Sequence, residues 1–349
     1  MRESLQDTAT DPRSRRTRGT LRRVGIAGTG SYAPEHVLSN ADLERMVDTS
    51  DEWIRARTGM QERRIARPDQ ATSDLAIQAG RRALQDAGLA ADELDLIVVA
   101  TATPDTLFPA TACRVQAGLG AHRAATFDIS AACSGFVHAL TTCQGLLASR
   151  AFDHALVIGA EVLSSIVDYK DRNTCVLFGD AAGAVVLAPC SGEDPPGELL
   201  DNVIGTDSSG IDLIQQPGGG SRHPATAETV AANLHFMKLE GRKVFKFAVN
   251  AICESVDQIL RRNGLTLDDL DLLIPHQANL RIIEAATERL GLDPSRVAVN
   301  IERYGNTSSA SIPLVLDELA RAGRLQRGQL VCLAAFGAGL SWGTTLLRW

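Results

Sequence analysis

Aromatic residues are scarce in this chain: Phe, Trp and Tyr make up 4% of its 349 residues. The formal charge is also acidic, at −7. Nucleic acids bind on basic surfaces, and single strands stack on aromatic side chains, so both features argue against a nucleic-acid partner. The sequence also has no run of about 18 apolar residues, and therefore no candidate for a transmembrane helix.

Closely spaced cysteines are also missing. The cysteines are scattered, odd in number and include no CxxC pair; they lie at positions 113, 133, 143, 175, 190, 253 and 332. A disulfide framework or a zinc site needs regularly spaced cysteines, so we expect neither of these, and no metal. Free thiols are typical of a reducing compartment, which predicts a cytoplasmic protein.

The amino-terminal segment differs from the rest in charge. Residues 1–23 hold seven arginines and three acidic residues, a charge of +4, which leaves −11 for the remainder. The segment has no apolar core, so it is not a secretory signal. An Arg- and Ser-rich leader can direct organelle import, but Glu3, Asp7 and Asp11 weaken that interpretation. We expect residues 1–21 to form a disordered tail.

The chain contains an internal repeat. Residues 82–101 and 258–277 both show a helix end, Gly-Leu, a short acidic turn, Leu-Asp-Leu and an apolar strand. Gly88 matches Gly264, and glycine at this place ends a helix in the left-handed conformation. A chain longer than roughly 250–300 residues also exceeds one core. We therefore predict two similar halves, residues 22–190 and residues 236–349. A looped insertion at residues 191–235 would connect them.

Helix and strand patterns alternate in both halves, which predicts an α/β fold of mainly parallel, mixed sheets covered by helices. If the halves pack pseudo-symmetrically, the strand–turn–helix at Cys133 faces its counterpart near Asn306. The strand that ends at Pro275 then brings His276 beside them. Ligands bind open α/β sheets at such strand ends, so we expect the functional site there.

Cys133 lies in DISAACSGF, after a strand pattern and before a helix pattern. Small neighbours allow a sharp turn and the close approach of a substrate. The N–H groups of a helix starting near Ser134 would favour the thiolate, which is the nucleophilic form. A lone cysteine is more often a small buried apolar residue, so this position alone leaves both interpretations open.

The two candidate partners of Cys133 differ in strength. His276 follows the apolar strand end in LLIPHQANLR, whereas most lone histidines lie on the surface or are satisfied in a core. Asn306 lies in RYGNTSS, which is typical of a turn followed by a helix N-cap. Only the repeat connects Asn306 with the other two.

Two glycine-rich stretches imitate nucleotide sites. Residues 28–33 satisfy G-x-G-x-x-A, but Pro34 follows and no helix start is evident, so the dinucleotide fingerprint lacks its context. Residues 218–220 are three glycines without a following Lys-Ser/Thr, which favours a loose loop. We expect no nucleotide site at either.

Seven stretches together resemble the β-ketoacyl-acyl carrier protein synthase III family of the thiolase superfamily. They extend over nearly the whole chain from about residue 22: SDEWIRARTG (50–59), DISAACSGF (128–136), KDRNTCVLFGDAAGA (170–184), VFKFAV (244–249), PHQANLRII (275–283), GNTSSAS (305–311) and FGAGLSWG (336–343). The resemblance implies a thiolase-like fold, with two duplicated α-β-α halves stacked in five layers, α-β-α-β-α.

The same residues separate this family from its relatives. A thiolase carries a second cysteine in the last glycine turn, and residues 336–339 contain none. Elongating ketosynthases use Cys-His-His, whereas the third position here is Asn306. Plant-type polyketide synthases share Cys-His-Asn, but the stretches at 51–54 and 275–279 resemble the carrier-protein family.

The resemblance implies a reaction without a metal or redox cofactor. Cys133 would take an acyl group from acyl-CoA, with the backbone N–H groups of Cys133 and Ala338 holding the oxyanion. Ala338 stands where the family usually has glycine. His276 and Asn306 would hold the thioester carbonyl of malonyl-acyl carrier protein as carbon dioxide leaves. The resulting carbanion would attack the acyl-cysteine.

Binding residues are also implied by the resemblance. Trp53 and Arg172 would enclose the CoA adenine, Arg57 would lie near the phosphates, and Asn279 would bond the pantetheine arm. Arg242 stands where some members have a second pantetheine-binding asparagine. In a family of homodimers, Phe108 would close the partner's acyl pocket, which suggests a short primer. The carrier protein is acidic and would dock on a basic surface that includes these residues: Gln277, Ala278, Asn279, Leu280, Arg281 and Lys246, with Arg242 and Lys243 nearby.

Other functions stay open at this stage. A starter-unit ketosynthase of a polyketide pathway, or an acyltransferase that does not decarboxylate malonyl groups, would share the same fold. A cysteine hydrolase of acyl thioesters would use the same three residue types but release a free acid. A non-catalytic partner subunit would be expected to lose the cysteine, which this chain keeps.

Overall fold

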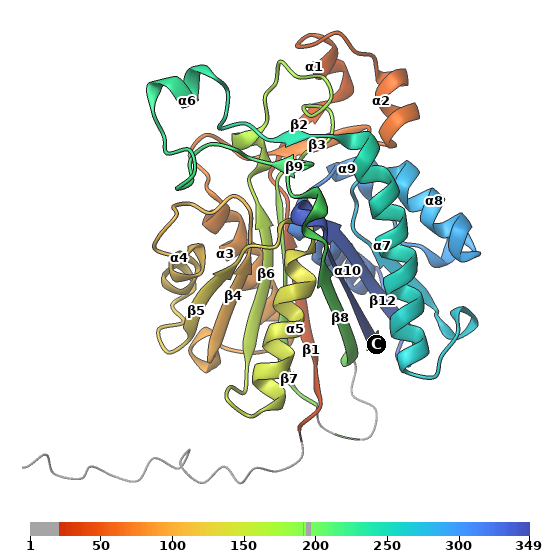
Figure 1. The fold of residues 1–349 in the computed structure, drawn as a ribbon. Helices are drawn as coiled ribbons and strands as arrows, with labels where there is room; N and C mark the ends of the chain where they lie inside the picture. Colours follow the sequence, from red (N-terminus) through yellow and green to blue (C-terminus); the bar gives the residue numbers. More distant parts are fainter. Residues whose placement is uncertain (1–20, 191, 193–196) are drawn as a thin grey trace, which may run out of the picture.

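The computed structural model describes residues 21–190, 192 and 197–349 (Figure 1). The tail expected at residues 1–21 therefore lies, apart from its last residue, outside the described residues. In the part of the chain that is described, no helix is long and apolar enough to cross a membrane.

One mixed sheet of nine strands passes through the molecule in the order β11-β12-β13-β8-β1-β7-β6-β4-β5. The first half supplies five strands: β1 (Val24–Tyr32), β4 (Leu96–Ala100), β5 (Ala125–Ile129), β6 (Ala155–Glu161) and β7 (Ala181–Pro189). The remaining four strands follow in the chain: β8 (Glu198–Thr206), β11 (Leu272–Pro275), β12 (Leu330–Gly337) and β13 (Ser341–Arg348). The predicted α/β class is confirmed.

Parallel pairing is more limited than expected. Strand β4 pairs in parallel with β5 and β6, and β11 with β12, whereas the other neighbours are antiparallel. The short turn between β12 and β13 allows only a hairpin, because a parallel pair needs a long crossover connection.

Helices divide the molecule into layers (Figure 1). Helices α3 (Thr72–Ala87) and α4 (Thr111–Leu119) cover one outer face, and α7 (Gly241–Arg262) and α8 (Leu280–Leu290) cover the other. Helices α5 (Gly135–Ala148) and α10 (Ser311–Arg321) lie between the two parts of the sheet. The order is therefore α-β-α-β-α.

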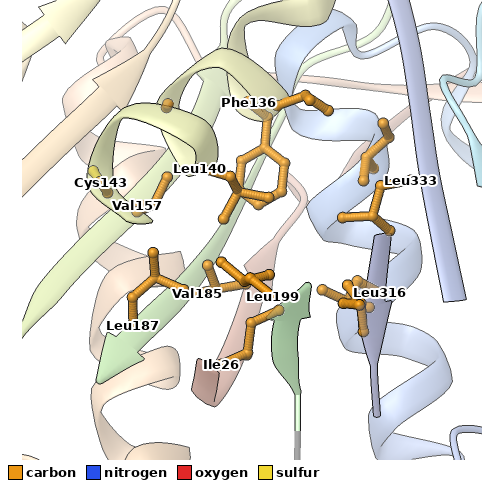
Figure 2. Packing of buried hydrophobic residues seen from close by; sticks show 14 of the residues in the cluster. Ile26, Phe136, Leu140, Cys143, Val157, Val185, Leu187, Leu199, Leu316 and Leu333 are labelled. Carbon is orange, nitrogen blue, oxygen red and sulfur yellow. The ribbon is translucent and has the colours of Figure 1, made fainter. Parts of the chain in front are cut away.

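The buried side chains of the strands alternate between these layers. In β4, Val98 faces the central apolar cluster and Val99 faces the outer one. Figure 2 shows the central cluster, to which Phe136 of α5, Leu316 of α10 and Leu333 of β12 all contribute. Both halves of the chain contribute to one core, so the functional site between them rests on a rigid base.

The repeat in the sequence is present in the fold. Helix α3 ends at Gly88 with φ 62°, and α7 is followed by Gly264 with φ 68°. The pairing registers agree as well, because Leu96 lies opposite Ala155 in the first half while positions 272 and 331 are opposite in the second. The same register of the repeat therefore holds through helix, turn and paired strands.

The segment at 191–235 is more regular than the loop we expected. It contains the nine-residue strand β8, the short strand β9 (Ile214–Gln215) and helix α6 (Ala227–Ala231). Strand β8 joins the two halves, pairing with β13 and, at one position, with β1. Its residues are partly exposed and include Asp201, Asn202 and Thr206, so the alternation that marks a strand is weak.

A smaller unit covers one end of the large sheet (Figure 1). It combines β2 (His36–Ser39), α1 (Asn40–Glu44), α2 (Asp51–Thr58), β3 (Glu62–Ile65), α9 (Ile301–Tyr304) and β10 (Lys238–Leu239). Apolar side chains from all of these elements except β3 form one cluster with Phe178 and Met237. This cap lies over the strand ends where the sequence predicted the site.

The stretch at 28–33 belongs to strand β1 rather than to a nucleotide-binding turn. A Cβ on Gly28 would lie 2.4 Å from the backbone nitrogen of Ala87, and one on Gly30 would lie 2.3 Å from that of Ala83. These glycines therefore let α3 pack directly on the strand.

Candidate active site

An apolar cavity of about 220 Å³ lies between the two halves and the cap. Six of the predicted site residues line it: Cys133, His276, Ala278, Asn279, Asn306 and Ala338. Segments that are far apart in the sequence therefore meet at the strand ends, as the repeat predicted.

Cys133 lies in a short 3-10 turn, Ala132–Ser134, between strand β5 and helix α5. Ala132 has φ 45°, a left-handed conformation that residues with a Cβ adopt rarely. A Cβ on Gly337 would lie 2.8 Å from the backbone nitrogen of Cys133, so glycine is required on the other side of the turn. The small residues of DISAACSGF therefore serve a tight junction.

The environment of the thiol differs from our expectation. We predicted that the start of the helix would favour the thiolate. Cys133 is half-buried at the wall of the cavity, where the loss of water around the sulfur raises the pKa of Cys133 to about 12; a hydrogen bond with Ser308 lowers this pKa, and an ionised Glu161 would raise it further. Burial outweighs the helix because a charged sulfur loses its water. The thiol is therefore protonated at neutral pH when the cavity holds no substrate.

His276 follows strand β11 and is buried. Its Nδ1 lies 2.7 Å from the hydroxyl of Ser311, and the ring of Phe336 packs against its edge at 5.4 Å between centroids. Burial lowers the pKa of His276 to about 3, so the ring is neutral. When the Ser311 hydroxyl donates to Nδ1, the imidazole proton lies on Nε2, which has no protein partner in the described chain.

Asn306 is held by its backbone on both sides. Its N–H donates to Leu177 at 2.8 Å, and its carbonyl accepts from Gly179 at 3.0 Å. The side-chain oxygen accepts from the N–H of Ser308 at 2.9 Å. Within the described residues nothing accepts from the side-chain nitrogen, so the amide N–H groups are free to face a ligand. His276 and Asn306 thus supply two uncharged donors beside a thiol.

Ala338 begins a second turn, Ala338–Leu340, directly after strand β12. Gly339 has φ 71° and Leu340 has φ 49°, so the backbone turns sharply at the wall of the cavity. An N–H donor in such a turn works equally with alanine or glycine, and Ala338 itself is not in the left-handed region.

The predicted CoA residues lie in the cap, apart from Asn279. The guanidinium of Arg172 lies over the ring of Trp53 at 4.6 Å, and Arg57 is exposed on the same helix as Trp53. A Cβ on Gly59 would lie 2.5 Å from that of Leu280, so the end of α2 packs tightly on the start of α8. This contact brings the Trp53 helix next to Asn279, which caps α8.

The predicted docking residues do not all reach the surface. Gln277 is fully buried and bonds to Pro275, Ala298 and Asn300, because the chain turns inward after the strand. Ala278 is 9% exposed and lines the cavity. Both predictions of carrier contact are wrong for these reasons. Leu280 is half-buried, while Arg281 is exposed.

Exposed basic side chains continue the surface from Arg281. Arg242, Lys243 and Lys246 are exposed on α7, which packs beside α8 (Figure 1). Lys243 pairs with Glu240 at 2.7 Å, whereas the structure gives Lys246 and Arg281 no ion pair within its described part. A basic surface therefore lies next to the cavity on an acidic protein.

Phe108 is absent from the cavity of its own chain. It lies between β4 and α4 and is 86% exposed, and its neighbour Leu107 is 80% exposed. An apolar pair this exposed is typical of an interface with another chain.

The sequence did not direct us to several polar residues around the cavity. Ser308 lines it, Ser311 orients His276, and Glu161 is buried close to Cys133. Ser308 belonged to a stretch that we interpreted as a turn and N-cap, and Ser311 lies just beyond it. A glutamate that ends the apolar strand ALVIGAE was a visible signal, because buried acids are rare.

Comparisons with family models and with individual proteins of known family lead to the same family. The family model described as 3-oxoacyl-[acyl-carrier-protein (ACP)] synthase III matches residues 127–208, and its C-terminal model matches residues 260–349. The chain is 55% identical over 329 residues to β-ketoacyl-[acyl-carrier-protein] synthase III of Symbiobacterium thermophilum. This match covers 94% of the chain and 99% of the relative.

Solved structures agree with the sequence comparison. The 3-oxoacyl-[acyl-carrier-protein] synthase III of Aquifex aeolicus superimposes with a TM-score of 0.85 at 45% identity, covering 93% of this chain and 100% of the other. The priming β-ketosynthase of the R1128 polyketide pathway has a TM-score of 0.87 at 36% identity, covering 95% and 98%. The fold is therefore shared with enzymes of both pathways.

Proposed function

Because the chain belongs to the β-ketoacyl-[acyl-carrier-protein] synthase III family, we propose that it joins an acyl primer to malonyl-acyl carrier protein at Cys133. The products are β-ketoacyl-acyl carrier protein, carbon dioxide and CoA, and the reaction initiates fatty acid synthesis. The observation that carries this assignment is one apolar cavity that combines a thiol with the uncharged donors of His276 and Asn306.

In the first half-reaction the sulfur of Cys133 attacks the thioester carbonyl of acyl-CoA. The N–H groups of Cys133 and Ala338 hold the oxyanion, and the bond between the carbonyl and the CoA sulfur breaks. CoA leaves as the thiol with the proton that Cys133 gives up. This transfer of a proton from Cys133 to CoA is consistent with a thiol that is protonated before the substrate binds.

In the second half-reaction His276 and Asn306 donate to the thioester carbonyl of the malonyl group. Loss of carbon dioxide leaves the electron pair on the α-carbon as an enolate, which the two donors stabilise. The carbon then attacks the acyl-cysteine, and the C–S bond breaks to release Cys133 as a thiolate, which takes a proton from water to restore the thiol. A neutral imidazole suits this role, because Nε2–H donates without having to gain a proton first.

The substrate groove extends from the cavity to the cap. Arg172 stacks directly on Trp53 at 4.6 Å, so an adenine ring would enter between them only as the guanidinium moves off the indole, and Arg57 is placed on the same helix as Trp53 for the phosphates. Asn279 lines the cavity, where the pantetheine arm would pass.

The acyl carrier protein is the second substrate, and its acidic surface would meet Arg281 and Lys246. A homodimer is supported by Phe108 and Leu107, which are exposed beside the edge strand β5. Phe108 would then close the partner's acyl pocket, favouring a short primer. Light scattering of the purified protein at twice the monomer mass is the expected result. The enzyme would work in the cytoplasm, which its seven free cysteines suit.

The decisive experiment is the intact-protein mass after incubation with a panel of acyl-CoAs, followed by malonyl-acyl carrier protein. We expect one acyl adduct, absent in Cys133→Ala, that the carrier discharges as a β-ketoacyl product with release of carbon dioxide. An adduct that discharges to free acid would indicate a hydrolase, and transfer without carbon dioxide an acyltransferase. No adduct from any acyl-CoA would overturn the assignment of the CoA donor.

The second candidate is a starter-unit enzyme of a polyketide pathway, favoured by the similarity to the R1128 priming ketosynthase. The chemistry is the same, so the carrier distinguishes the two. Faster discharge by a polyketide carrier than by a fatty-acid carrier would support this candidate.

A further inference from the structure

Glu161 ends strand β6 and is fully buried close to the nucleophile. In the described residues its carboxyl group meets only hydroxyl and backbone N–H groups, and no lysine or arginine pairs with it. Its hydrogen-bond partners are Thr101, Ala102, Thr103 and Ser309. A buried carboxylate without a counter-charge is costly, so its protonation state requires an explanation.

The hydrogen bonds around Ser309 indicate where the proton lies. The Ser309 hydroxyl is 2.9 Å from the carbonyl oxygen of Ala100 and 2.8 Å from Oε1 of Glu161. A hydroxyl has one proton, and the Ala100 carbonyl can only accept. Ser309 can therefore give its proton fully to only one of these two oxygens, and a proton on Oε1 of Glu161 would let it keep both contacts.

The other carboxyl oxygen is surrounded by donors. Oε2 lies 2.8 Å from the hydroxyl of Thr103, 3.0 Å from the N–H of Ala102 and 3.2 Å from the hydroxyl of Thr101. The Thr103 oxygen accepts from the N–H of Val162, which leaves its proton for Oε2. Oε1 lies 3.2 Å from the same Ala102 N–H and 2.8 Å from the Ser309 hydroxyl, so a neutral acid would carry its proton on Oε1.

This acid is linked to both parts of the proposed reaction. The side chain of Ser308 interacts with the Cys133 thiol and with Glu161, and it lowers the pKa of each. The N–H of Ser308 also holds the side chain of Asn306. Ser308 itself has φ 49°, so the turn that Glu161 fastens is strained.

The repeat shows that the two halves have diverged at this point. In the register that matches Gly88 with Gly264, Glu161 corresponds to Gly337, and Ser309 corresponds to Cys133. Gly337 packs against Cys133 as Glu161 packs against Ser309. The turn of the first half carries the nucleophile Cys133, whereas the matching turn of the second half carries Ser309, which is hydrogen-bonded to Glu161.

We propose that Glu161 is a positioning residue held as a neutral carboxylic acid. It donates to Ser309, fixes residues 306–309 against the Cys133 turn, and spares the thiolate and the enolate a second negative charge. The effect on the thiolate and the enolate rests on the proposed function. The protonation state of Glu161 and its hold on the turn at residues 306–309 are independent of that function.

Glu161→Gln tests the idea, because the amide can donate to Ser309 and accept from Thr103 as the acid does. We expect this variant to keep condensation within about threefold of the unchanged enzyme at neutral pH, while Glu161→Ala loses roughly a hundredfold. As the pH rises and Glu161 ionises, we expect the unchanged enzyme to lose activity. We also expect its Cys133 to react with iodoacetamide more slowly than Cys133 of the Glu161→Gln variant. The Gln variant shows neither effect. Glu254→Gln, an exposed position on α7, is the matched control.

Infrared difference spectra give a readout that needs no substrate. We expect the carbonyl band of a protonated carboxylic acid in the unchanged protein at neutral pH, retained in Glu254→Gln and lost in Glu161→Gln. Absence of this band, or loss of activity in Glu161→Gln comparable to that in Glu161→Ala, overturns the proposal. Failure of the proposed function is distinct, because it appears as unchanged protein that no acyl-CoA modifies.

Discussion

At the scale of single residues, burial leaves the titratable groups of the cavity without charge. The pKa of His276 is lowered to about 3 and that of Cys133 is raised to about 12, in both cases mainly because the charged form would lose water. The cavity therefore offers neutral donors to a substrate that develops negative charge. Stabilisation of that charge, rather than a preformed ion pair, is the chemistry that these residues suit.

Replacing the Asn306 amide with a carboxyl group tests this view. Asn306→Asp keeps the oxygen that accepts from Ser308 but removes the N–H donors. We expect condensation to fall by roughly 10²–10³-fold, while acylation of Cys133 changes little. The release of CoA and of carbon dioxide, followed separately in one turnover, measures the two steps. Equal losses in both would contradict a role confined to the malonyl group.

The neutral His276 also predicts how stability depends on pH. The unfolded residue takes up a proton below pH 6.5 and the folded residue only near pH 3. The folded state thus binds fewer protons in this window, and its contribution to stability is lost as pH falls from 6.5 toward 3. We expect His276→Asn to remove a slope of about 1.4 kcal/mol per pH unit from urea unfolding measured between these limits.

At the scale of elements, close contacts between backbones decide where glycine occurs. Strand β1 carries Gly28 and Gly30 because α3 lies directly on it. Gly337 admits the turn that carries Cys133 in the same way. The glycine pattern at residues 28–33, which imitates a phosphate-binding loop, is therefore explained by the close packing of α3 on β1.

Gly28→Ala should show this cost. The added Cβ would lie 2.4 Å from the backbone of Ala87, so α3 must shift. We expect a loss of roughly 1–3 kcal/mol in the free energy of unfolding. Gly145→Ala is the control, since Gly145 lies inside α5 with nothing within 4 Å of the added atom. It should be neutral or stabilising by up to about 1 kcal/mol. Equal effects of the two substitutions would refute the packing argument.

At the scale of the whole molecule, the duplicated halves produce an asymmetric site. Cys133 comes from the first half, while His276 and Asn306 come from the second, and they meet only where the halves pack. Charge is also uneven, since a protein with a net charge of −7 presents basic side chains on α7 and α8 beside the cavity. Such a local surface can attract an acidic partner in spite of the overall charge.

Arg281→Glu tests that surface. We expect kcat/KM for malonyl-acyl carrier protein to fall about tenfold and to lose salt dependence, with acylation by acyl-CoA unchanged. Arg261→Glu, the same charge change at the far end of α7, should affect neither step. The two half-reactions are compared by steady-state rates at several salt concentrations. A similar decrease in acylation would mean that Arg281 serves CoA instead.

The sequence by itself determined the α/β class, the repeat that matches Gly88 with Gly264, and the positions of Cys133, His276 and Asn306. The class and the repeat follow from strand periodicity and from glycine at helix ends, which depend on neighbours within a few residues. The three residues were singled out by the repeat and by the resemblance to the family, because the local patterns alone left their roles open.

Only the tertiary structure decided which of these residues are charged, buried or reachable. Gln277 turned out to be internal, the Cys133 thiol has a raised rather than a lowered pKa, and β8 formed where we expected a loop. Glu161 gained its neighbours from three separate segments. Desolvation and the sharing of hydrogen-bond donors depend on packing between segments that are remote in the chain, so no local pattern encodes them.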